Sequence, residues 1–567
     1  MIDTQKPTSP VRAQLPAPDE LMQPTRLATL APSRLSASRS LLNKMAREEW
    51  SVECVRFDID DRARGEAIYR VHAPGMSFDF MVFSFEPVLE GRTGRIIGTA
   101  WDMLGALVEG EATPEIVDQT RAEMPKLYAG RATPNTLIWC RSNRSLRLFE
   151  HVVERLAAGA QPDGDELWRV GYLMRNTGLD GNGTFGTKSF VAYEADHPLR
   201  VPYHAQMLAV FLMREFSFDL AEHLARTINP QAATLDADLK RILGLGNGSG
   251  LGLVYFVNNH PVLLDRWLTL RAEAVRMCQD LPVVVGSPAW NRMHDLLRRA
   301  ARFYDDDPSP YEAFTHPTVI AEGLRLIRKE LEALAAAGGD VRYGDVVASD
   351  RYDVCQEAIE VFNVLLLELR PDEVDAAIEH FAVDETLRGR PEATVRELLD
   401  LIRRDYGWAY AYDMADPRQC RYRWYKSETA EEPRRGPVEE VPVSHEWALD
   451  IPGEVQRITR RLEAEPTDRT VGEYLLDYPE DRRMVERIQG LAELSYHSPH
   501  MNMLAEDFIP VHIIRLMNAA FHGIDKTVDN FGRFVMGLLL HGAPTRADLN
   551  QRSGLDWIYP ERPAERA

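Results

Sequence analysis

Histidines are concentrated in one short part of the chain. Five of the fifteen histidines lie between residues 497 and 541, and carboxylates occur among them. Imidazole and carboxylate groups are common ligands of zinc and iron, and a histidine can also serve as a general acid or base. The candidate catalytic residues in this region are His497, His500, His512, His522, Glu506 and Asp507.

The spacing of these histidines does not single out a metal site. Pro499 separates His497 from His500 and disfavours a helix that presents both. On one helix, His512 and His522 would project about 80° apart. The metalloprotease pattern H-E-x-x-H is absent from the sequence. A bound divalent metal therefore stays one alternative, and histidines that only form hydrogen bonds in the core or at the surface are the other.

A first glycine-rich stretch, GLDGNGTFGTKSF at residues 178–190, nearly matches the phosphate-binding loop G-x-x-x-x-G-K-[ST]. Thr187 separates Gly186 from Lys188, which would turn the lysine away from a phosphate. The strand-forming sequence FVAYEADHP then stands where that loop requires the start of a helix. The stretch therefore predicts a β-hairpin with a glycine-rich turn.

A second stretch, GLGNGSGLG at residues 244–252, has glycine at every second position. This regular spacing excludes the dinucleotide-binding pattern G-x-G-x-x-G. Clustered glycines allow close approach either of a ligand or of another backbone segment. If the two stretches meet, their amides and polar side chains would form a pocket for an anion. The candidate ligand-binding residues are Arg175, Asn176, Asn182, Gly183, Thr184, Lys188, Asn247, Gly248 and Ser249.

Basic and aromatic residues alternate between residues 418 and 428. Arg421, Arg423 and Lys426 belong to this segment. The alternation is typical of an amphipathic strand with one basic face. Alternatively, one of the three side chains faces a cleft and anchors a small carboxylate or phosphate, for which the two-pronged arginine is well suited. The three residues complete the set of candidate ligand-binding residues.

The charge balance limits the partners. The chain carries 87 acidic and 66 basic residues, a formal net charge of -21, which repels nucleic acids and anionic membranes. Five widely spaced cysteines without a C-x-x-C pair favour a reducing compartment. No apolar run reaches the length of about 18 residues needed to span a bilayer, and no secretory signal is evident. We expect a soluble cytoplasmic protein without nucleic acid or membrane partners; homo-oligomerisation and organelle targeting by the N-terminal tail stay open.

The elements that must position these residues are mostly helices. Short β-rich runs between residues 51 and 100 predict an antiparallel meander, followed by helices at 101–127 and 144–159. From about residue 202, apolar residues repeat at helical spacing. The expected fold class is α+β and predominantly helical, with an N-terminal antiparallel β meander and helices followed by a large helical body.

The chain divides by composition into five parts. Proline and serine predict a disordered tail at residues 1–40. An α+β domain with the glycine-rich hairpin is expected at 41–200, and a helical domain at 201–426. Charge and proline predict a linker or loop at 427–443. A C-terminal helical block packed on the body is expected at 444–567.

These features predict an enzyme that acts on a small anionic metabolite, a carboxylate or a phosphate, with the reaction type unresolved. The first alternative is a helical interaction or scaffold protein, in which the glycines serve packing. The second is a metal-dependent oxidoreductase that uses the C-terminal histidines.

Overall fold

The structure is a computed structural model. It describes residues 24–27, 29–87, 101–128, 136–180, 193–247, 260–306, 316–381, 387–416, 422–427, 434–437, 446–496, 510–528 and 535–563. In this part of the chain, no helix has both the length and the apolar character needed to cross a membrane.

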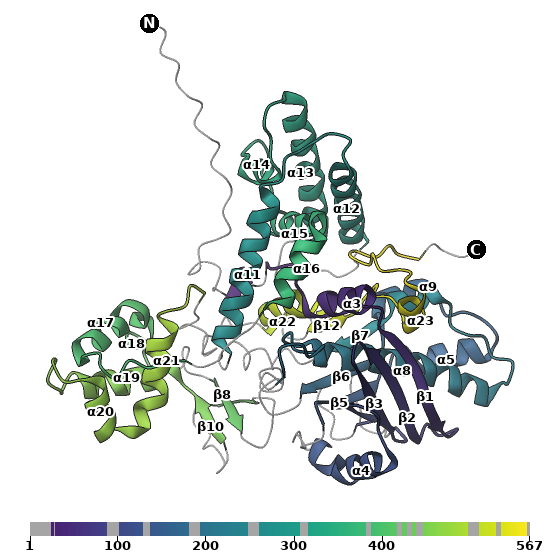
Figure 1. The fold of residues 1–567 in the computed structure, drawn as a ribbon, viewed down its shortest axis with the longest axis horizontal. Helices are drawn as coiled ribbons and strands as arrows, with labels where there is room; N and C mark the ends of the chain where they lie inside the picture. The colour runs from purple at the N-terminus through teal and green to yellow at the C-terminus, as the bar shows by residue number, and fades with distance from the viewer. Residues whose placement is uncertain are drawn as a thin grey trace, which may run out of the picture.

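A large sheet forms the base of the molecule (Figure 1). In the described residues it has nine strands in the order β1-β2-β3-β4-β5-β6-β7-β12-β11. All neighbours are antiparallel except β6 and β7, which are parallel. The strands are β1 (Ser51–Ile59), β2 (Gly65–Ala73), β3 (Met76–Ser84), β4 (Met103–Glu109), β5 (Ile138–Arg144), β6 (Tyr172–Asp180), β7 (Gly244–Asn247), β11 (Gly523–Val528) and β12 (Val535–Leu539).

The first three strands form the predicted antiparallel meander. β2 and β3 are joined through Pro74 and Gly75, and Gly75 has a φ of 80°. Proline followed by a glycine with positive φ is the sequence requirement of a type II turn. This local chemistry explains why the meander could be predicted from the sequence.

The prediction of a helix over residues 101–127 was wrong in its first part, which forms the fourth strand. Residues 103–109 form β4, and the helix α4 (Pro114–Tyr128) follows it. Six consecutive residues of β4 are buried, because the strand lies inside the sheet with both faces covered. A strand buried on both faces has a continuous apolar sequence, which periodicity cannot distinguish from a helix.

Helices cover both faces of the sheet. α8 (His204–Ile228) is buried along most of its length and packs on β3 to β7 and on α5 (Phe149–Ala157). On the other face, Val117 of α4 belongs to a cluster with Val108 and Trp139. Other, shorter helices are α3 (Ala37–Arg47), α6 (Gly164–Val170), α9 (Ala237–Ile242) and α23 (Arg546–Gln551).

Arg214 joins α8 to two distant segments. Its side chain is fully buried, and its Nε donates a hydrogen bond to the carbonyl of Leu243 at 2.6 Å. The two Nη atoms donate to the carbonyls of Lys240, Arg241, Ala543 and Pro544 at 2.9–3.3 Å. One guanidinium therefore satisfies carbonyls at the end of α9 and just before α23.

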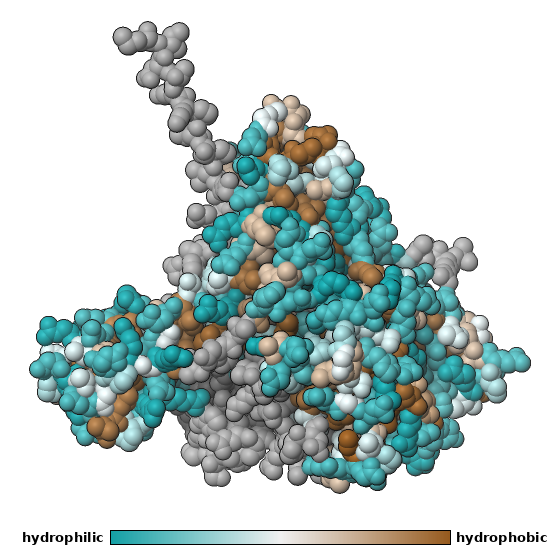
Figure 2. Space-filling model, in the orientation of Figure 1, coloured by the Kyte–Doolittle hydropathy of each residue, from teal (hydrophilic) through white to brown (hydrophobic). Residues whose placement is uncertain are grey.

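A helical lobe stands above the sheet in Figure 1. It consists of α11 (Pro261–Gln279), α12 (Pro288–Asp305), α13 (Pro317–Ala337), α14 (Tyr343–Ala348), α15 (Gln356–Leu366), η1 (Leu367–Leu369) and α16 (Pro371–Glu379). Its apolar residues belong to the same hydrophobic cluster as those of the sheet and α8. Figure 2 shows a largely hydrophilic surface over this lobe, with apolar residues scattered across it.

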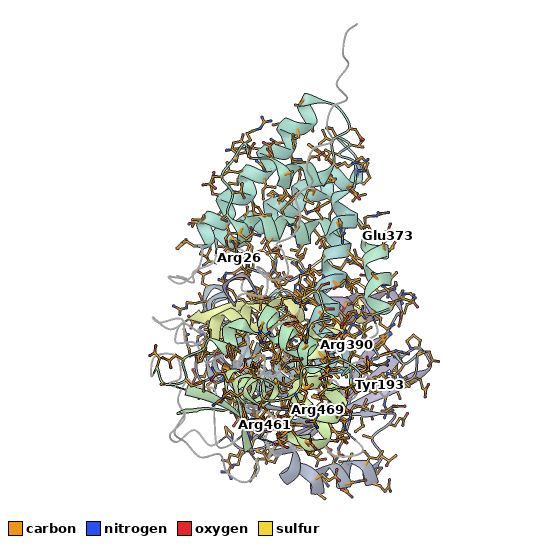
Figure 3. All side chains as sticks on the ribbon, turned by 90° about the vertical axis from the view of Figure 1, so that its left-hand side faces the viewer. Arg26, Tyr193, Glu373, Arg390, Arg461 and Arg469 are labelled. Carbon is orange, nitrogen blue, oxygen red and sulfur yellow. The ribbon has the colours of Figure 1, made fainter. Side chains whose placement is uncertain are left out.

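A second lobe is inserted between α16 and α22 (Pro510–Phe521), and it has a hydrophobic cluster of its own. Figure 3 labels Arg390, Arg461 and Arg469 in this lobe. Its helices are α17 (Val395–Asp405), α18 (Gly407–Tyr410), α19 (Ile451–Leu462), α20 (Val471–Asp477), η2 (Pro479–Asp481) and α21 (Arg482–Leu491). A small sheet in the order β10-β8-β9 follows α18, with β8 (Tyr422–Ser427), β9 (Arg434–Pro437) and β10 (Glu446–Leu449).

The small sheet corrects the expectation of a linker at residues 427–443. β9 lies inside that range and pairs with β8. Charged residues and proline are tolerated in an edge strand, because one side of its backbone has no partner strand. The predicted boundary between the helical domain and the C-terminal block therefore falls within one lobe.

The C-terminal block is not only helical. After α22 the chain forms β11 and β12, and β12 pairs with β7. The sheet thus combines strands from residues 51–180, 244–247 and 523–539, so a boundary at residue 200 does not separate two structural units. Such pairing between distant segments leaves no local trace in the sequence.

Residues 29–40 are not a disordered tail. Leu30 and Leu35 are buried in the main hydrophobic cluster. Ser36 Oγ donates a hydrogen bond to the carbonyl of Ala519 at 2.6 Å, and Ser38 Oγ donates to that of Phe521 at 2.5 Å. The last carbonyls of a helix lack partners within the helix, so these serines satisfy the C-terminal end of α22.

Candidate ligand pocket

A cavity of about 110 Å³ lies where the upper helical lobe meets the sheet. Residues from distant parts of the chain line it: the segment 29–32, the helices α12, α13, α15 and α22, the strands β11 and β12, and residues 558–560. Cavities of about 150 Å³ accommodate benzene, so a group enclosed in this smaller space is no larger than a ring or a short branched chain. Its chemistry depends on the few polar groups among the apolar ones.

Aromatic residues form one wall. The ring centroid of Tyr559 lies 5.4 Å from that of Phe303 and 5.8 Å from that of Tyr304. These are distances at which aromatic pairs attract each other. Burial raises the pKa of Tyr559 well above its ordinary value, so the phenol stays neutral. The wall therefore offers apolar ring faces together with neutral hydroxyl groups.

Arg515 and Asn518 of α22 and His522, which directly follows the helix, contribute three polar side chains. Arg515 and Asn518 are three residues apart, which places their side chains on one side of the helix. Asn518 Oδ1 lies 2.6 Å and 2.8 Å from the positions where a Cβ would stand on Gly523 and Gly537. A larger residue at either position would displace the Asn518 amide from its place beside β11 and β12.

His522 directly follows α22 with a φ of 66°, and its ring makes an edge contact with Trp557 at 4.5 Å between centroids. Burial lowers the pKa of His522 to about 3; the nearby charge of Arg39 adds to this effect, and a backbone hydrogen bond with Ser33 opposes it. The imidazole is therefore neutral at neutral pH. It can form hydrogen bonds there, but it is a weak base.

His541 lies beyond the end of β12, and a hydrogen bond at Nδ1 fixes the orientation of its ring. Its Nδ1 is 2.6 Å from the carbonyl oxygen of Ile242, so Nδ1 carries the proton and donates it. The ring packs against Trp168 at 4.8 Å. This hydrogen bond fixes Nδ1 as a protonated nitrogen, so that in the neutral ring the lone pair is on Nε2.

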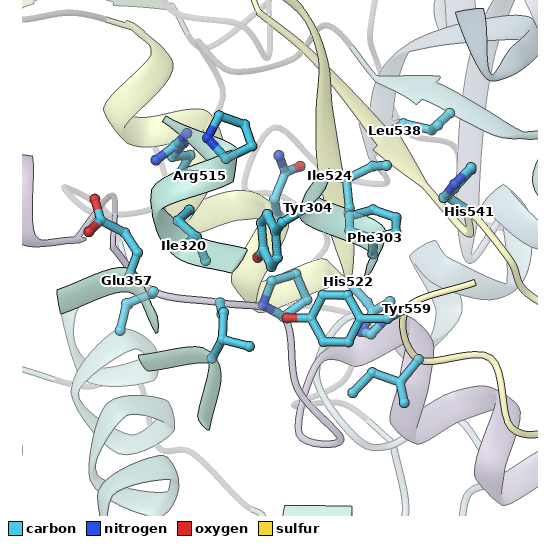
Figure 4. Close-up of a pocket in the computed structure, with 18 of the residues that line it drawn as sticks. Phe303, Tyr304, Ile320, Glu357, Arg515, His522, Ile524, Leu538, His541 and Tyr559 are labelled. Atoms are coloured by element: carbon cyan, nitrogen blue, oxygen red, sulfur yellow. The ribbon is translucent and has the colours of Figure 1, made fainter. Parts of the chain in front are cut away.

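The charged groups lie at one end of the pocket. In the view of Figure 4, Arg515 and Glu357 are on one side, His541 is on the other, and Tyr304 and His522 lie between them. The pocket thus has the charged residues Arg515 and Glu357 at one end, where α22 and α15 line it. Uncharged polar groups, among them His522 and Tyr559, lie along the rest. A ligand would have to match this asymmetry.

Of the predicted catalytic residues, the structure places His522 in the pocket. His512 lies on α22, but its side chain is outside the described residues, as are His497, His500, Glu506 and Asp507. The described part of the chain contains no group of three or more His, Cys, Asp or Glu residues that could hold a metal ion. A metal held by the undescribed histidines stays a prediction.

The predicted glycine-rich site is partly described. Arg175 pairs with Gly246 and Asn176 with Asn247, so the strands that lead into the two stretches are adjacent and parallel. The ends of adjacent parallel strands share one edge of a sheet, which is a frequent place for ligands. The remaining predicted residues, Asn182, Gly183, Thr184, Lys188, Gly248 and Ser249, lie outside the described residues.

The expected hairpin is equally untested, because its turn and second run lie outside the described residues. In the described sheet, the neighbours of β6 are β5 and β7. Arg423 and Lys426 are on β8 in the inserted lobe, where only the backbone is described, and Arg421 lies outside the described residues. Anchoring of an anion by one of these three side chains therefore stays a prediction.

Sequence reasoning missed most of the pocket. Phe303, Tyr304 and Tyr559 come from segments far apart in the chain, and no pattern connects them. Arg515 and Asn518 could have been found, because they share one face of the predicted helix that leads to His522.

The comparisons with known proteins give no relative: no family model, no curated protein and no solved structure matches the chain. The chemistry of the pocket is therefore the basis for a function.

Proposed function

We propose that the protein is an enzyme whose substrate, a small metabolite with an apolar body and one carboxylate, binds in this pocket. The observation that carries the proposal is the convergence of Arg515, Asn518 and His522 on a cavity otherwise walled mainly by aromatic and aliphatic side chains. Small-molecule sites are typically such apolar hollows with a few converging polar groups.

The charges favour one orientation of the substrate. Its apolar body would lie against Phe303, Tyr304 and Ile320, and its carboxylate would lie toward Arg515, whose guanidinium can bind it through two hydrogen bonds. Glu357 at the same end would repel a second negative charge. We therefore favour a monocarboxylate over a phosphate.

The polar groups favour polarisation of the substrate over proton abstraction by His522. With a pKa of about 3, this imidazole is too weak a base for efficient proton removal at neutral pH. Neutral imidazole, phenol and amide groups fixed in a largely apolar site can instead stabilise charge that develops on a substrate oxygen.

The test is isothermal titration of the full chain with benzoate and 3-methylbutanoate, and with the corresponding amides. We expect the carboxylates to bind and the amides to bind at least tenfold more weakly. Substitution Arg515→Gln should remove this preference, because it removes the cation. Equal binding of acid and amide to the wild-type protein would contradict the proposal.

A matched pair of variants tests the place of binding. Ile320→Phe fills the pocket, whereas Val319→Phe adds the same group to the neighbouring residue, which is 49% exposed and does not line it. We expect binding to be lost in the first variant and kept in the second. Circular dichroism checks that both are folded.

A further inference from the structure

A groove of about 230 Å³ runs between α12 and α13, and it is lined by four arginines. Arg298 and Arg302 come from α12, and Arg325 and Arg328 from α13. Asp305 is the one acidic residue in its described lining. Four guanidinium groups thus gather in one hollow of a chain with a net charge of -21.

The two helices place the arginines together for a simple reason. Arg298 and Arg302 are four residues apart and Arg325 and Arg328 are three apart, so each pair lies on one side of its helix. Leu297 and Leu324 are buried in the seam between the helices and form the floor. The guanidinium groups stand above this floor, with side chains 41–53% exposed.

Such an arrangement is unfavourable without anions. Like charges at these helical spacings repel each other by roughly 0.2–0.5 kcal/mol per pair. The neighbouring acids of the same two helices partly compensate: Asp295 pairs with Arg298 at 2.7 Å, Glu332 with Arg328 at 3.6 Å, and Asp305 and Glu322 with Arg325. These are exposed pairs, and exposed pairs contribute little free energy.

A carboxylate from outside the two helices contacts two of the four arginines. Glu561, near the C-terminal end, places Oε1 3.1 Å from Nη1 of Arg302 and 3.4 Å from Nη1 of Arg298. The Glu561 side chain is itself half-exposed. Arg298 and Arg302 thus already hold an anionic side chain from a distant segment, through exposed contacts that a stronger ligand could replace.

We propose that this groove binds a small multivalent phosphate and that Glu561 competes for two of its arginines in the free protein. Guanidinium groups bind phosphate oxygens through paired hydrogen bonds, and several of them can share one polyphosphate. A compact ligand fits the small groove, whereas the overall negative charge opposes the approach of a nucleic acid.

The site is distinct from the pocket described above, although both use α12 and α13. Tyr304 and Ile320 line the pocket, whereas Arg302 and Leu324 line the groove. Four residues, or about one helical turn, separate Ile320 from Leu324. Binding of a phosphate in the groove does not require a ligand in the pocket, so the two proposals can fail independently.

The experiment is isothermal titration of the full chain with inorganic diphosphate at constant ionic strength. We expect the double variant Arg302→Ala and Arg325→Ala to bind at least tenfold more weakly than the wild type. Lys329→Ala removes one positive charge from α13 at a residue that does not line the groove and should keep wild-type affinity. Glu561→Gln should tighten binding several-fold, because it removes the competing carboxylate.

Three outcomes would overturn the proposal: no heat of binding with the wild-type protein, an equal loss in Lys329→Ala, or unchanged affinity in Glu561→Gln. Thermal unfolding of each variant shows whether it is folded. If the double variant does not fold, the single variants Arg302→Gln and Arg328→Gln replace it. Each should bind diphosphate more weakly than the wild type.

Discussion

Gly246 of β7 faces Arg175 of β6 across the parallel pair of strands in the described sheet. A Cβ on Gly246 would stand 3.2 Å from Cγ of Arg175 and 3.0 Å from the ring of Tyr172. The arginine stem thus occupies the space that a side chain on β7 would need. The absence of that side chain lets the buried arginine stem lie against β7.

Substitution Gly246→Ala should therefore destabilise the protein, by about 1–3 kcal/mol as for other overpacked core positions. Urea unfolding measures the change. Gly407→Ala is the matched control, because a Cβ there meets no atom within 4 Å and its φ is not in the left-handed region. Equal stability of the two variants would show that the packing against Arg175 is loose.

Substitution Arg214→Lys should be strongly destabilising although it keeps the charge. The guanidinium donates to five backbone carbonyls from a fully buried position, and an ammonium group has three donors at one point. We expect a loss of about 3–5 kcal/mol, typical of disrupted buried charge networks. In the same helix, Arg226→Lys at a half-exposed position should change stability by less than about 0.5 kcal/mol.

Stability should fall as the pH is lowered from about 7 toward 3. Burial lowers the pKa of both His204 and His522 to about 3, with the charges of Lys44 and Arg39 adding to the effect. The unfolded chain binds these protons near pH 6.5 and the folded protein does not, so protonation favours unfolding. Each histidine contributes a slope of at most about 1.4 kcal/mol per pH unit in this window.

Urea midpoints at pH 7.5 and 5.5 measure this slope. It should become shallower in His204→Gln and stay unchanged in His72→Gln, where the side chain is half-exposed. A wild-type midpoint that is equal at both pH values would be incompatible with neutral burial of the two imidazoles.

Two N-terminal deletions should behave differently. Removal of residues 1–23 should leave the melting temperature nearly unchanged, as their proline-rich composition predicts. Removal of residues 1–40 should lower it by many degrees. The longer deletion loses buried Leu30 and Leu35, the serine hydrogen bonds to α22, and the pair between Arg34 Nε and Asp375 at 2.7 Å. Differential scanning calorimetry distinguishes the two outcomes.

The sequence predicted those parts of the fold that are decided locally. Alternation and the Pro74–Gly75 turn identified β1 to β3, and helical spacing identified the long helices of the upper lobe. β7 could not be found, because Gly-Leu-Gly-Asn has no strand preference by itself. It becomes a strand because β6 and β12 pair with its two edges.

The same distinction holds for the pocket. The density of histidines indicated the region of His522, which is a local property of the sequence. The aromatic wall was not predictable, since Phe303 and Tyr559 meet only after the C-terminal segment packs on α12. The serines of residues 33–40 resemble a disordered tail in composition, and their role appears only when α22 lies beside them.

The place of β7 in the sheet has a consequence for synthesis of the chain. Its partner β12 is made last among the described strands, so the edge of β7 has no partner while residues 248 to 534 are being translated. Chains grow at about 5–20 residues per second, which leaves this edge open for tens of seconds. An open strand edge can pair with another chain. Until β12 is made, the edge of β7 is therefore a place at which two nascent chains can pair.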